Sequence, residues 1–252
     1  MSAEPDSVIL APHPTLEAYY AGAAVKRGFL KGIFDDAAQD YDHVERLLSW
    51  GTGSWYRRKA LVRAGLGQGM KVLDVAVGTG LVAREEITLV GDPKLIIGLD
   101  PSIGMMRQAV ASLNISAALG VAEQIPMGDE QFDFLSMGYA LRHLADLHRV
   151  FAEFYRVLRP GGRLCILEIT LPRRRAWRWF LRLYMRSIVP LLTRLTTGRA
   201  SSQLLWRYYW DTIEACLPPE TLLAALRQAG FVEAERHVEV GIFSEYTARK
   251  PE

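Results

Sequence analysis

The sequence predicts an α/β fold in which helices cover both faces of a mostly parallel β-sheet. Two observations predict this fold class. Short apolar runs, typical of buried strands, alternate with segments of helical periodicity between residues 71 and 169. One of these runs, residues 71–77, leads into Gly78-Thr79-Gly80, here called the glycine turn, and then into a helical pattern.

Each expected element follows from a local signal. Apolar runs indicate strands, helical spacing of apolar residues indicates helices, and Ser102 after Pro101 is a suitable N-cap. In chain order these are helices across 16–61 with a loop at 51–54, a strand at 71–77, a helix to about 90, a strand at 95–100, a helix to about 113, a strand at 132–137, a helix at 146–158, a turn at 159–162 and a strand at 163–169.

The last third of the chain adds an insertion and two β-like segments. An Arg- and Trp-rich stretch at 171–218 is followed by a helix at 220–229, closed by Gly230, and by β-like segments at 231–240 and 242–248. We expect the insertion over the carboxyl edge of the sheet, where open α/β sheets bind ligands. The expected domains are a helical cap at 1–60 and a main domain at 61–252, with an Arg- and aromatic-rich helical lid inserted at about 172–218.

Composition and charge exclude several classes of protein. Of the 252 residues, 50% are hydrophobic and 23% charged, which excludes disordered, collagen-like and coiled-coil chains. The net charge is only +2, so no nucleic-acid partner is expected. Cys165 and Cys216 fit neither a disulfide framework nor zinc-ligand spacing, which points to a reducing compartment. No His, Cys and Asp cluster has ligand spacing, so no metal is expected.

The sequence also predicts where the protein works. Residues 1–14 lack the positive region and apolar core of a signal peptide. The most apolar later stretch, residues 176–189, is interrupted by arginines and ended by Pro190, well short of the ~20 apolar residues that a spanning helix needs. We therefore expect a cytoplasmic protein, with association to the cytoplasmic membrane surface as an additional expectation.

The glycine turn and two aspartates narrow the choice of cofactor. Residues 78–83 match G-x-G-x-x-A, and Asp100 follows Gly80 by twenty residues, which a dinucleotide-binding fold also shows. Asp74, four positions before Gly78, would repel a pyrophosphate and attract a cation. S-adenosylmethionine carries an ammonium and a sulfonium but no phosphate, so the residues favour it over NAD. A purely structural turn with a solvated or capping aspartate is the alternative.

Several stretches, taken together, resemble known methyltransferases. Five motifs are similar to those of class I S-adenosylmethionine-dependent methyltransferases: VLDVAVGTG at 72–80, GLDPSIGMM at 98–106, AEQIP at 122–126, FDF at 132–134 and YRVLRPGG at 155–162. Four more resemble the ubiquinone/menaquinone C-methyltransferase (UbiE-type) family: FDDAAQDYD at 34–42, LSWG at 48–51, YALRH at 139–143 and YYWDTI at 208–213. The resemblance spans about Phe34 to Arg249, almost the whole chain.

The resemblance implies a Rossmann-like fold with a mostly parallel seven-stranded sheet and an antiparallel C-terminal strand. It also implies S-adenosylmethionine as cofactor. The residues that it implies around the cofactor are Asp74, Ala76, Gly78, Thr79 and Gly80 towards the methionine end, Asp100 at the ribose hydroxyls, Met105, Ala122 and Glu123 around the adenine, and Pro101 beside them.

Three positions depart from the family pattern. Val77 replaces a usual glycine, which is expected to narrow the glycine turn. Val121 stands where the family has Asn or Asp beside the adenine, which removes one polar contact. Gly53 falls where a His is common, so a polar substrate contact is expected to be missing.

The chemistry of ring methylation indicates candidate catalytic residues. A carbon of a phenol or quinol ring becomes nucleophilic when a ring hydroxyl loses its proton, which calls for a base or for a cation that stabilises the oxyanion. Arg142 and His143 follow a central strand, and Tyr41 comes from the N-terminal helices. Arg142 stays protonated and would stabilise the oxyanion or orient a water, whereas His143 titrates near neutrality. The alternatives are packing roles for His143 and Tyr41, and an ion pair between Arg142 and Asp146.

The insertion predicts a partner. Residues 173–199 contain eight arginines and no acidic residue, with aromatic residues between the arginines. This pattern suits a helix lying on an anionic membrane, and equally a lid that packs its apolar side on the substrate pocket. The expected partners are a small hydrophobic aromatic substrate and an anionic membrane that residues 173–199 contact; a homodimer is allowed.

These observations rank the functions. C-methylation of a hydrophobic phenolic or quinol ring, of the ubiquinone or menaquinone precursor type, leads. An O- or N-methyltransferase of a specialised metabolite is the runner-up, because similar cores serve many acceptors. A catalytically silent scaffold, motivated by Val77, Val121 and Gly53, and an NAD oxidoreductase, opposed by Asp74, are weaker.

Overall fold

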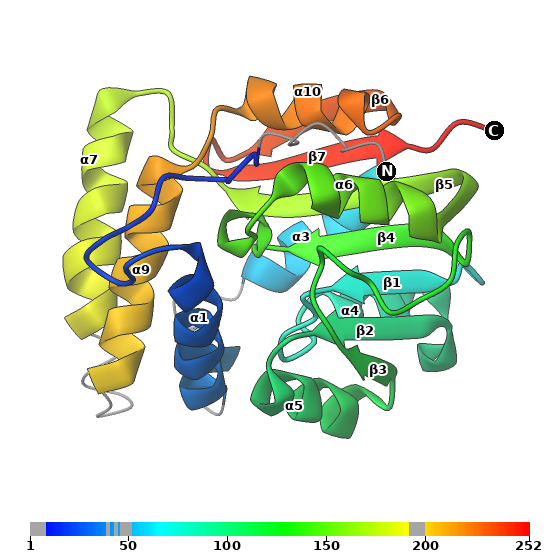
Figure 1. Cartoon of the computed structure of the whole chain (residues 1–252), viewed down its shortest axis with the longest axis horizontal. Helices are drawn as coiled ribbons and strands as arrows, with labels where there is room; N and C mark the ends of the chain where they lie inside the picture. Colours follow the sequence, from blue (N-terminus) through cyan, green and yellow to red (C-terminus); the bar gives the residue numbers. More distant parts are fainter. Residues whose placement is uncertain (1–8, 39–40, 43–44, 46–51, 192–199) are drawn as a thin grey trace, which may run out of the picture.

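The described residues form one seven-stranded sheet with the order β3-β2-β1-β4-β5-β7-β6 (Figure 1). The computed structural model describes residues 9–38, 41–42, 45, 52–191 and 200–252. The strands are β1 (Val72–Val75), β2 (Ile96–Asp100), β3 (Ser116–Leu119), β4 (Phe132–Gly138), β5 (Leu158–Ile169), β6 (Val232–Glu239) and β7 (Phe243–Arg249). Strands β1 to β5 pair in parallel, whereas β7 is antiparallel to both of its neighbours. The predicted fold class is confirmed.

Helices cover both faces of this sheet. One face is packed against α6 (Leu147–Val157) and α10 (Pro219–Gln228), and the other against α3 (Thr52–Arg63), α4 (Ala83–Val90) and α5 (Ile103–Leu113). Successive strand residues point to opposite faces, so Leu73 packs towards α6 and Val72 towards α3 and α4. In α6 the buried residues Leu147, Val150, Phe151 and Phe154 recur at helical spacing, which gives the helix one apolar face.

Three central strands end at the same level. Val75 of β1 pairs with Leu99 of β2 on one side and with Met137 of β4 on the other. The strand order reverses between β1 and β4, which is where open α/β sheets bind ligands. The segments that leave these strands include the glycine turn and the 3-10 turn η2 (Leu141–His143).

A further group of helices stands beyond the carboxyl ends of the parallel strands (Figure 1). It contains α1 (Ala23–Ala37), α7 (Arg175–Leu183), the π-helical turn η3 (Tyr184–Ile188) and α9 (Ala200–Ala215). Trp206, Tyr208 and Trp210 of α9 are buried in one apolar cluster with Tyr20 and with Ile33 of α1. The insertion therefore lies at the carboxyl edge, as predicted. None of the described helices is long and apolar enough to cross a membrane.

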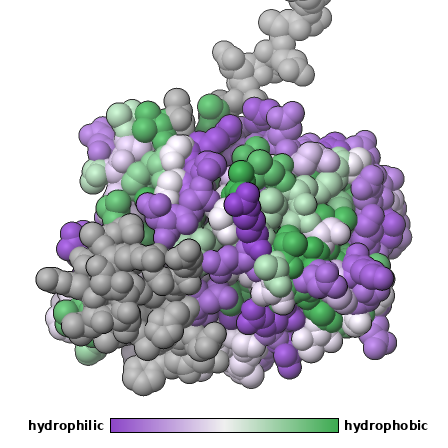
Figure 2. Space-filling model, turned by 90° about the horizontal axis from the view of Figure 1, so that it is seen from below, coloured by the Kyte–Doolittle hydropathy of each residue, from purple (hydrophilic) through white to green (hydrophobic). Residues whose placement is uncertain are grey.

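The surface on the side seen in Figure 2 is mixed. Hydrophilic residues surround small groups of hydrophobic ones across this face. This is the ordinary surface of a folded domain, in which apolar atoms remain partly exposed.

One strand was not anticipated, and one expected turn is found as a bulge within a longer strand. β3 has the sequence SAAL, with no apolar run and with Ser116 and Leu119 exposed at the sheet edge, so it carries no strand signal. The turn expected at 159–162 lies within β5. These four residues are looped out of the pairing with β4, whose register goes from Phe132–Leu158 directly to Phe134–Arg163, and Gly161 has φ 74°, so the turn is present as a bulge in the strand.

Two N-terminal boundaries also differ from expectation. The loop expected at 51–54 is wrong from Thr52 onward, because α3 begins there; residue 51 lies outside the described residues. The expected domain boundary at residue 60 falls inside α3. Tyr56, Ala60 and Leu61 of this helix are buried in the core with β1, so α3 packs as part of the main domain.

Candidate active site

A cavity of about 540 Å³ opens at the carboxyl edge of the sheet. This volume lies within the range of small-molecule sites, roughly 300–1,000 Å³. Its walls come from the ends of β1, β2 and β4, from α1 and from α9. Of the predicted site residues, the cavity is lined by Tyr41, Ala76, Gly78, Thr79, Asp100, Pro101, Met105, Ala122, Glu123 and His143. Asp74, Gly80 and Arg142 are not among its lining residues.

The glycine turn bends sharply under the cavity. Ala76, Gly78 and Gly80 all have positive φ, at 58°, 57° and 88°. At Gly80 a Cβ atom would lie 2.4 Å from Leu113 Cδ1, so a larger residue requires the Leu113 side chain to move. Gly80 therefore shapes the turn from behind and lets the backbone pass close to α5.

The substitution at Val77 is compensated on the neighbouring strand. Val77 lines the cavity, and its side chain lies over Gly98 of β2, where a Cβ atom would come within 2.8 Å of Val77 Cγ1. The bare backbone at Gly98 thus supplies the room that the valine needs. The valine also donates its backbone N–H to Leu99 O at 3.1 Å, which ties the turn to β2.

Asp100 is the best-placed carboxylate of the cavity. Its Oδ2 accepts a hydrogen bond from Gly78 N at 2.8 Å, and its Oδ1 accepts one from Ser102 N at 2.7 Å. Each oxygen keeps a further lone pair, so the carboxylate is able to accept hydrogen bonds from two ligand hydroxyls. Burial raises the pKa of Asp100 to about 6.

Asp74 lies behind the cavity, contrary to its expected role. It is on the face of β1 that packs towards α4, because its side chain points the same way as that of Val72. There its Oδ1 accepts a hydrogen bond from Ser136 Oγ at 3.3 Å. Burial, and then the carboxyl of Glu86 in α4, raise the pKa of Asp74 well above its usual range. Asp74 therefore does not present a charge to a ligand in the cavity.

The opposite end of the cavity is more apolar. Met105, Val121 and Ala122 line it, together with Glu123. Glu123 Oε1 accepts a hydrogen bond from Ala145 N at 2.8 Å, which fixes its carboxylate at the rim. With Val121 in place of a polar residue, this wall offers a flat aromatic ligand more apolar contact than polar recognition.

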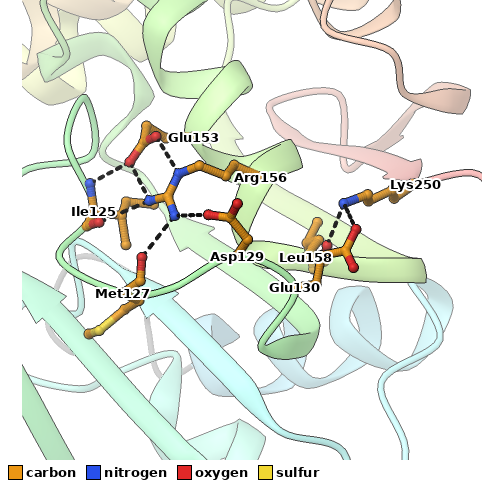
Figure 3. A network of polar contacts seen from close by, with 8 residues as sticks. All are labelled: Ile125, Met127, Asp129, Glu130, Glu153, Arg156, Leu158 and Lys250. Carbon is orange, nitrogen blue, oxygen red and sulfur yellow. Dashed lines mark hydrogen bonds and ion pairs between the residues drawn. The ribbon is translucent and has the colours of Figure 1, made fainter.

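A polar network holds the chain that follows this wall (Figure 3). Arg156 of α6 donates to Ile125 O at 3.0 Å, to Met127 O at 2.8 Å and to Asp129 Oδ1 at 2.7 Å. Glu153 Oε2 in turn accepts from Ile125 N at 2.7 Å. Charge-assisted bonds of this kind are stronger than neutral ones, so they fix the segment next to the apolar end of the cavity.

Arg142 supports the cavity wall from outside. It pairs with Glu168 of β5, and both side chains are almost fully buried. The alternative of an ion pair with Asp146 is wrong, because Arg142 pairs with Glu168 and Asp146 caps α6 by accepting from His148 N at 3.1 Å. The Arg142 guanidinium also lies 4.8 Å from the ring centre of Tyr209, a cavity residue. Arg142 therefore lies behind the cavity wall and contacts it through Tyr209.

His143 sits in an aromatic box at the cavity. Its ring is stacked on Tyr208 and Tyr209, with centroids 5.4 and 5.5 Å away, and meets Phe34 edge-on at 5.5 Å. Nδ1 lies 3.4 Å from Tyr208 Oη, and within the described residues Nε2 is buried without a hydrogen-bond partner. Burial, and then the charge of Arg142, lower the pKa of His143 well below its usual value, so the imidazole is neutral.

Tyr41 and Tyr209 face one another across the same wall. Their hydroxyl oxygens are 2.9 Å apart, and both rings line the cavity. The sequence had placed Tyr209 in a family-like motif without giving it a role. Tyr209 follows no predicted strand, so its place at the cavity depends on how α9 packs against α1.

Further cavity residues were missed, among them Arg57 of α3 and Glu45. Arg57 Nη1 donates to Glu45 Oε1 at 2.9 Å. The only signal that could have found Arg57 is a basic residue on a helix next to the glycine turn, which is too common to be specific. Among the described residues no group of His, Cys, Asp or Glu is arranged to hold a metal ion.

No residue of α7 lines the cavity in the described part of the chain; from the insertion, Tyr209 does. The interpretation of this stretch as a lid whose apolar side packs on the pocket is therefore wrong for α7. The reason is geometric: α7 packs through η3 against the outer side of α9, and none of its own residues is buried.

Comparison with known proteins identifies relatives over almost the whole chain. Residues 23–250 match the model of the ubiE/COQ5 methyltransferase family. The demethylmenaquinone methyltransferase of Symbiobacterium thermophilum is 32% identical over 83% of this chain and 87% of that protein. The ubiquinone/menaquinone biosynthesis C-methyltransferase UbiE of Geobacter sulfurreducens is 33% identical over 88% of each chain. A SAM-dependent methyltransferase from Aquifex aeolicus shares the fold, with a TM-score of 0.59 and 21% identity over 82% of this chain and 97% of its own.

Proposed function

The chain belongs to the ubiE/COQ5 methyltransferase family, and we propose that it methylates a ring carbon of a hydrophobic quinol of the menaquinone or ubiquinone type. It is an S-adenosylmethionine-dependent methyltransferase. The observation that supports a ring substrate most is the aromatic lining of the cavity, to which Phe34, Tyr41, His143 and Tyr209 contribute. Flat aromatic walls with few polar groups suit a flat apolar ring.

The cavity residues fit S-adenosylmethionine. Asp100 has lone pairs left for the two ribose hydroxyls after accepting from Gly78 and Ser102. The apolar wall with Met105 and Val121 suits the adenine. When bound, the cofactor supplies a methyl group on a positively charged sulfur, ready for displacement by a nucleophile.

His143 and Tyr41 are proposed to prepare the ring. In the tautomer in which Nδ1 donates to Tyr208 Oη, Nε2 of the neutral His143 accepts a hydrogen bond from a ring hydroxyl and draws its proton away. Tyr41 Oη donates to the developing oxyanion, because it faces the same cavity. Arg142, whose charge is paired with Glu168, holds Tyr209 in place through its contact with the Tyr209 ring.

The oxidation state of the acceptor tests this proposal. A quinol has the hydroxyl whose deprotonation makes the ring carbon nucleophilic, whereas a quinone has none. Purified protein with S-adenosylmethionine is expected to methylate demethylmenaquinol kept reduced by dithionite and to leave the oxidised quinone unchanged. His143→Ala is expected to lower kcat roughly 100-fold or more with unchanged binding of S-adenosylhomocysteine. Turnover of phenols or amines alone, without quinol turnover, contradicts the proposal and favours O- or N-methylation.

We also propose that α7 binds an anionic membrane surface near the substrate. Trp177, Trp179 and Phe180 are 61%, 60% and 56% exposed, and no residue of α7 is buried. The chain has no acidic residue between Glu168 and Asp211. Exposed aromatic rings beside arginines suit the boundary between lipid headgroups and acyl chains.

Vesicle flotation tests the membrane proposal. The protein is expected to float with vesicles of phosphatidylcholine and phosphatidylglycerol and not with phosphatidylcholine alone. Replacing Arg175, Arg178 and Arg182 with Gln is expected to weaken binding by about 100-fold, at ~1 kcal/mol per arginine. The control replaces two exposed arginines of other helices, Arg107→Gln and Arg149→Gln. Equal binding to both vesicle types, or equal loss in the control, contradicts the proposal.

A further inference from the structure

A buried ion pair faces the cavity beside the glycine turn. Arg57 Nη1 donates to Glu45 Oε1 at 2.9 Å, and the two side chains are 5% and 21% exposed. Both residues line the cavity. Within the described part of the chain, Arg57 Nε is buried with no hydrogen-bond partner. A buried N–H of a charged group without an acceptor is costly, so this guanidinium is suited to a further anionic ligand.

The surrounding chain places this pair at the turn. Asp42, three positions before Glu45, accepts a hydrogen bond from Thr79 Oγ1 at 2.5 Å. On the other side, α3 packs on α4, the helix that follows the turn, and Arg58 next to Arg57 pairs with Glu85 of α4 at 2.8 Å. The segment that carries Glu45 and the helix that carries Arg57 are thus both fixed next to the glycine turn.

Gly53 makes room for the pair. A Cβ atom at this position would lie 2.5 Å from Glu45 Oε1 and 3.0 Å from Arg57 Nη1. A side chain such as His at position 53 would therefore displace the ion pair. The expectation of a missing polar contact at Gly53 is replaced by a different one: the space is occupied by a salt bridge of this chain.

The charges of the pair match those of an amino acid. The methionine end of S-adenosylmethionine carries a carboxylate and an ammonium, and a site that removes both from water has to pair each of them. Asp74, the residue expected to bind the ammonium, lies behind the cavity, and its raised pKa favours the neutral, protonated carboxyl. Among the charged residues that line the cavity, Arg57 and Glu45 form a pair of opposite charges.

We propose that Arg57 binds the carboxylate and Glu45 the ammonium of the cofactor's methionine moiety, with Gly53 opening the space in which the pair forms. This inference rests on S-adenosylmethionine being the cofactor and is independent of the acceptor. The pair selects ligands that carry the amino-acid moiety over those that carry only the adenosyl part. Arg57 offers a planar fork of N–H groups that matches a carboxylate.

Calorimetric titration with two ligands tests the proposal without turnover. S-adenosylhomocysteine has the amino-acid moiety, and methylthioadenosine lacks it. Arg57→Gln is expected to weaken S-adenosylhomocysteine binding by roughly 10- to 100-fold and to leave methylthioadenosine binding unchanged. The control is Arg149→Gln, because Arg149 of α6 is exposed, does not line the cavity and takes no part in the contacts described above. It is expected to leave both affinities unchanged.

A second ligand separates the two charges. Decarboxylated S-adenosylhomocysteine keeps the ammonium and lacks the carboxylate, so its affinity is expected to respond to Glu45→Gln and not to Arg57→Gln. Arg57→Lys keeps the charge and is expected to recover part of the affinity, provided that circular dichroism shows a folded protein. The proposal is overturned if Arg57→Gln weakens the binding of S-adenosylhomocysteine and of methylthioadenosine equally, or weakens the binding of neither. Loss of quinol methylation with intact discrimination between the ligands would instead count against the proposed acceptor.

Discussion

Replacing Glu168 with leucine leaves the Arg142 guanidinium buried without the carboxylate that neutralises it. Arg142 and Glu168 are each only 1% exposed, and they form an ion pair between β5 and the turn η2. Removing one partner of a buried pair costs about 3–5 kcal/mol of unfolding free energy. In a chain of this size 1 kcal/mol lowers the Tm by about 2–4 °C, so the Tm is expected to fall by roughly 6–20 °C.

Thermal unfolding followed by circular dichroism measures this effect, and two further variants control it. Glu233→Gln breaks the pair between Glu233 and Arg249, in which Glu233 is 61% exposed, and is expected to leave the Tm close to that of the parent because solvent screens this pair. Adding Arg142→Met to Glu168→Leu removes the unpaired charge and is expected to restore much of the stability. A Glu168→Leu protein with the same Tm as the parent, or a double variant with a lower Tm than Glu168→Leu alone, refutes this reasoning.

Three further predictions concern the cofactor site. Burial raises the pKa of Asp100 to about 6, so its carboxylate is ionised above that pH, and the affinity for S-adenosylhomocysteine measured by calorimetry is expected to weaken as the pH falls through 6. Asp100→Asn is expected to abolish this pH dependence. An Asp100→Asn protein whose affinity depends on pH as the parent's does contradicts the prediction. Gly80→Ala puts a Cβ atom 2.4 Å from Leu113 Cδ1 at φ 88°, at an expected cost of about 2–4 kcal/mol in urea unfolding; parent-like stability would argue against it. Arg156→Met removes the hydrogen bond to Ile125 O and so loosens the segment next to the apolar end of the cavity. The KM for the cofactor is expected to rise several-fold with little change in kcat. A change in kcat alone contradicts a role of Arg156 in positioning this segment.

Local signals predicted most of the fold. Strands β1, β2 and β4 are apolar runs of the kind that a two-sided sheet buries, and Ser102 caps α5 as its side chain predicts, accepting from Met105 N. The edge strand β3 escaped because its small, half-exposed residues need no apolar pattern. The strand β5 extends through a proline and two glycines because a bulge absorbs them, which sequence spacing does not reveal.

Part of the candidate site could be predicted from the sequence, and the position of each residue relative to a strand explains which part. Residues that follow a strand directly, such as Asp100 and His143, reach the carboxyl edge because the sheet places them there. Asp74 was misplaced because the two-residue alternation of a strand sends its side chain to the opposite face. The pairing of Arg142 with Glu168, 26 positions away, depends on how β5 lies beside β4, which no local pattern encodes.

The position of the transferred methyl group tests the central claim most directly. The protein is incubated with S-adenosylmethionine carrying a ¹³C-methyl group and with reduced demethylmenaquinol, and the product is analysed by ¹³C NMR and mass spectrometry. We predict a single labelled methyl group bound to a ring carbon. A labelled methyl group on oxygen, or no labelled product from the quinol while another acceptor is methylated, would contradict C-methylation of a quinol ring.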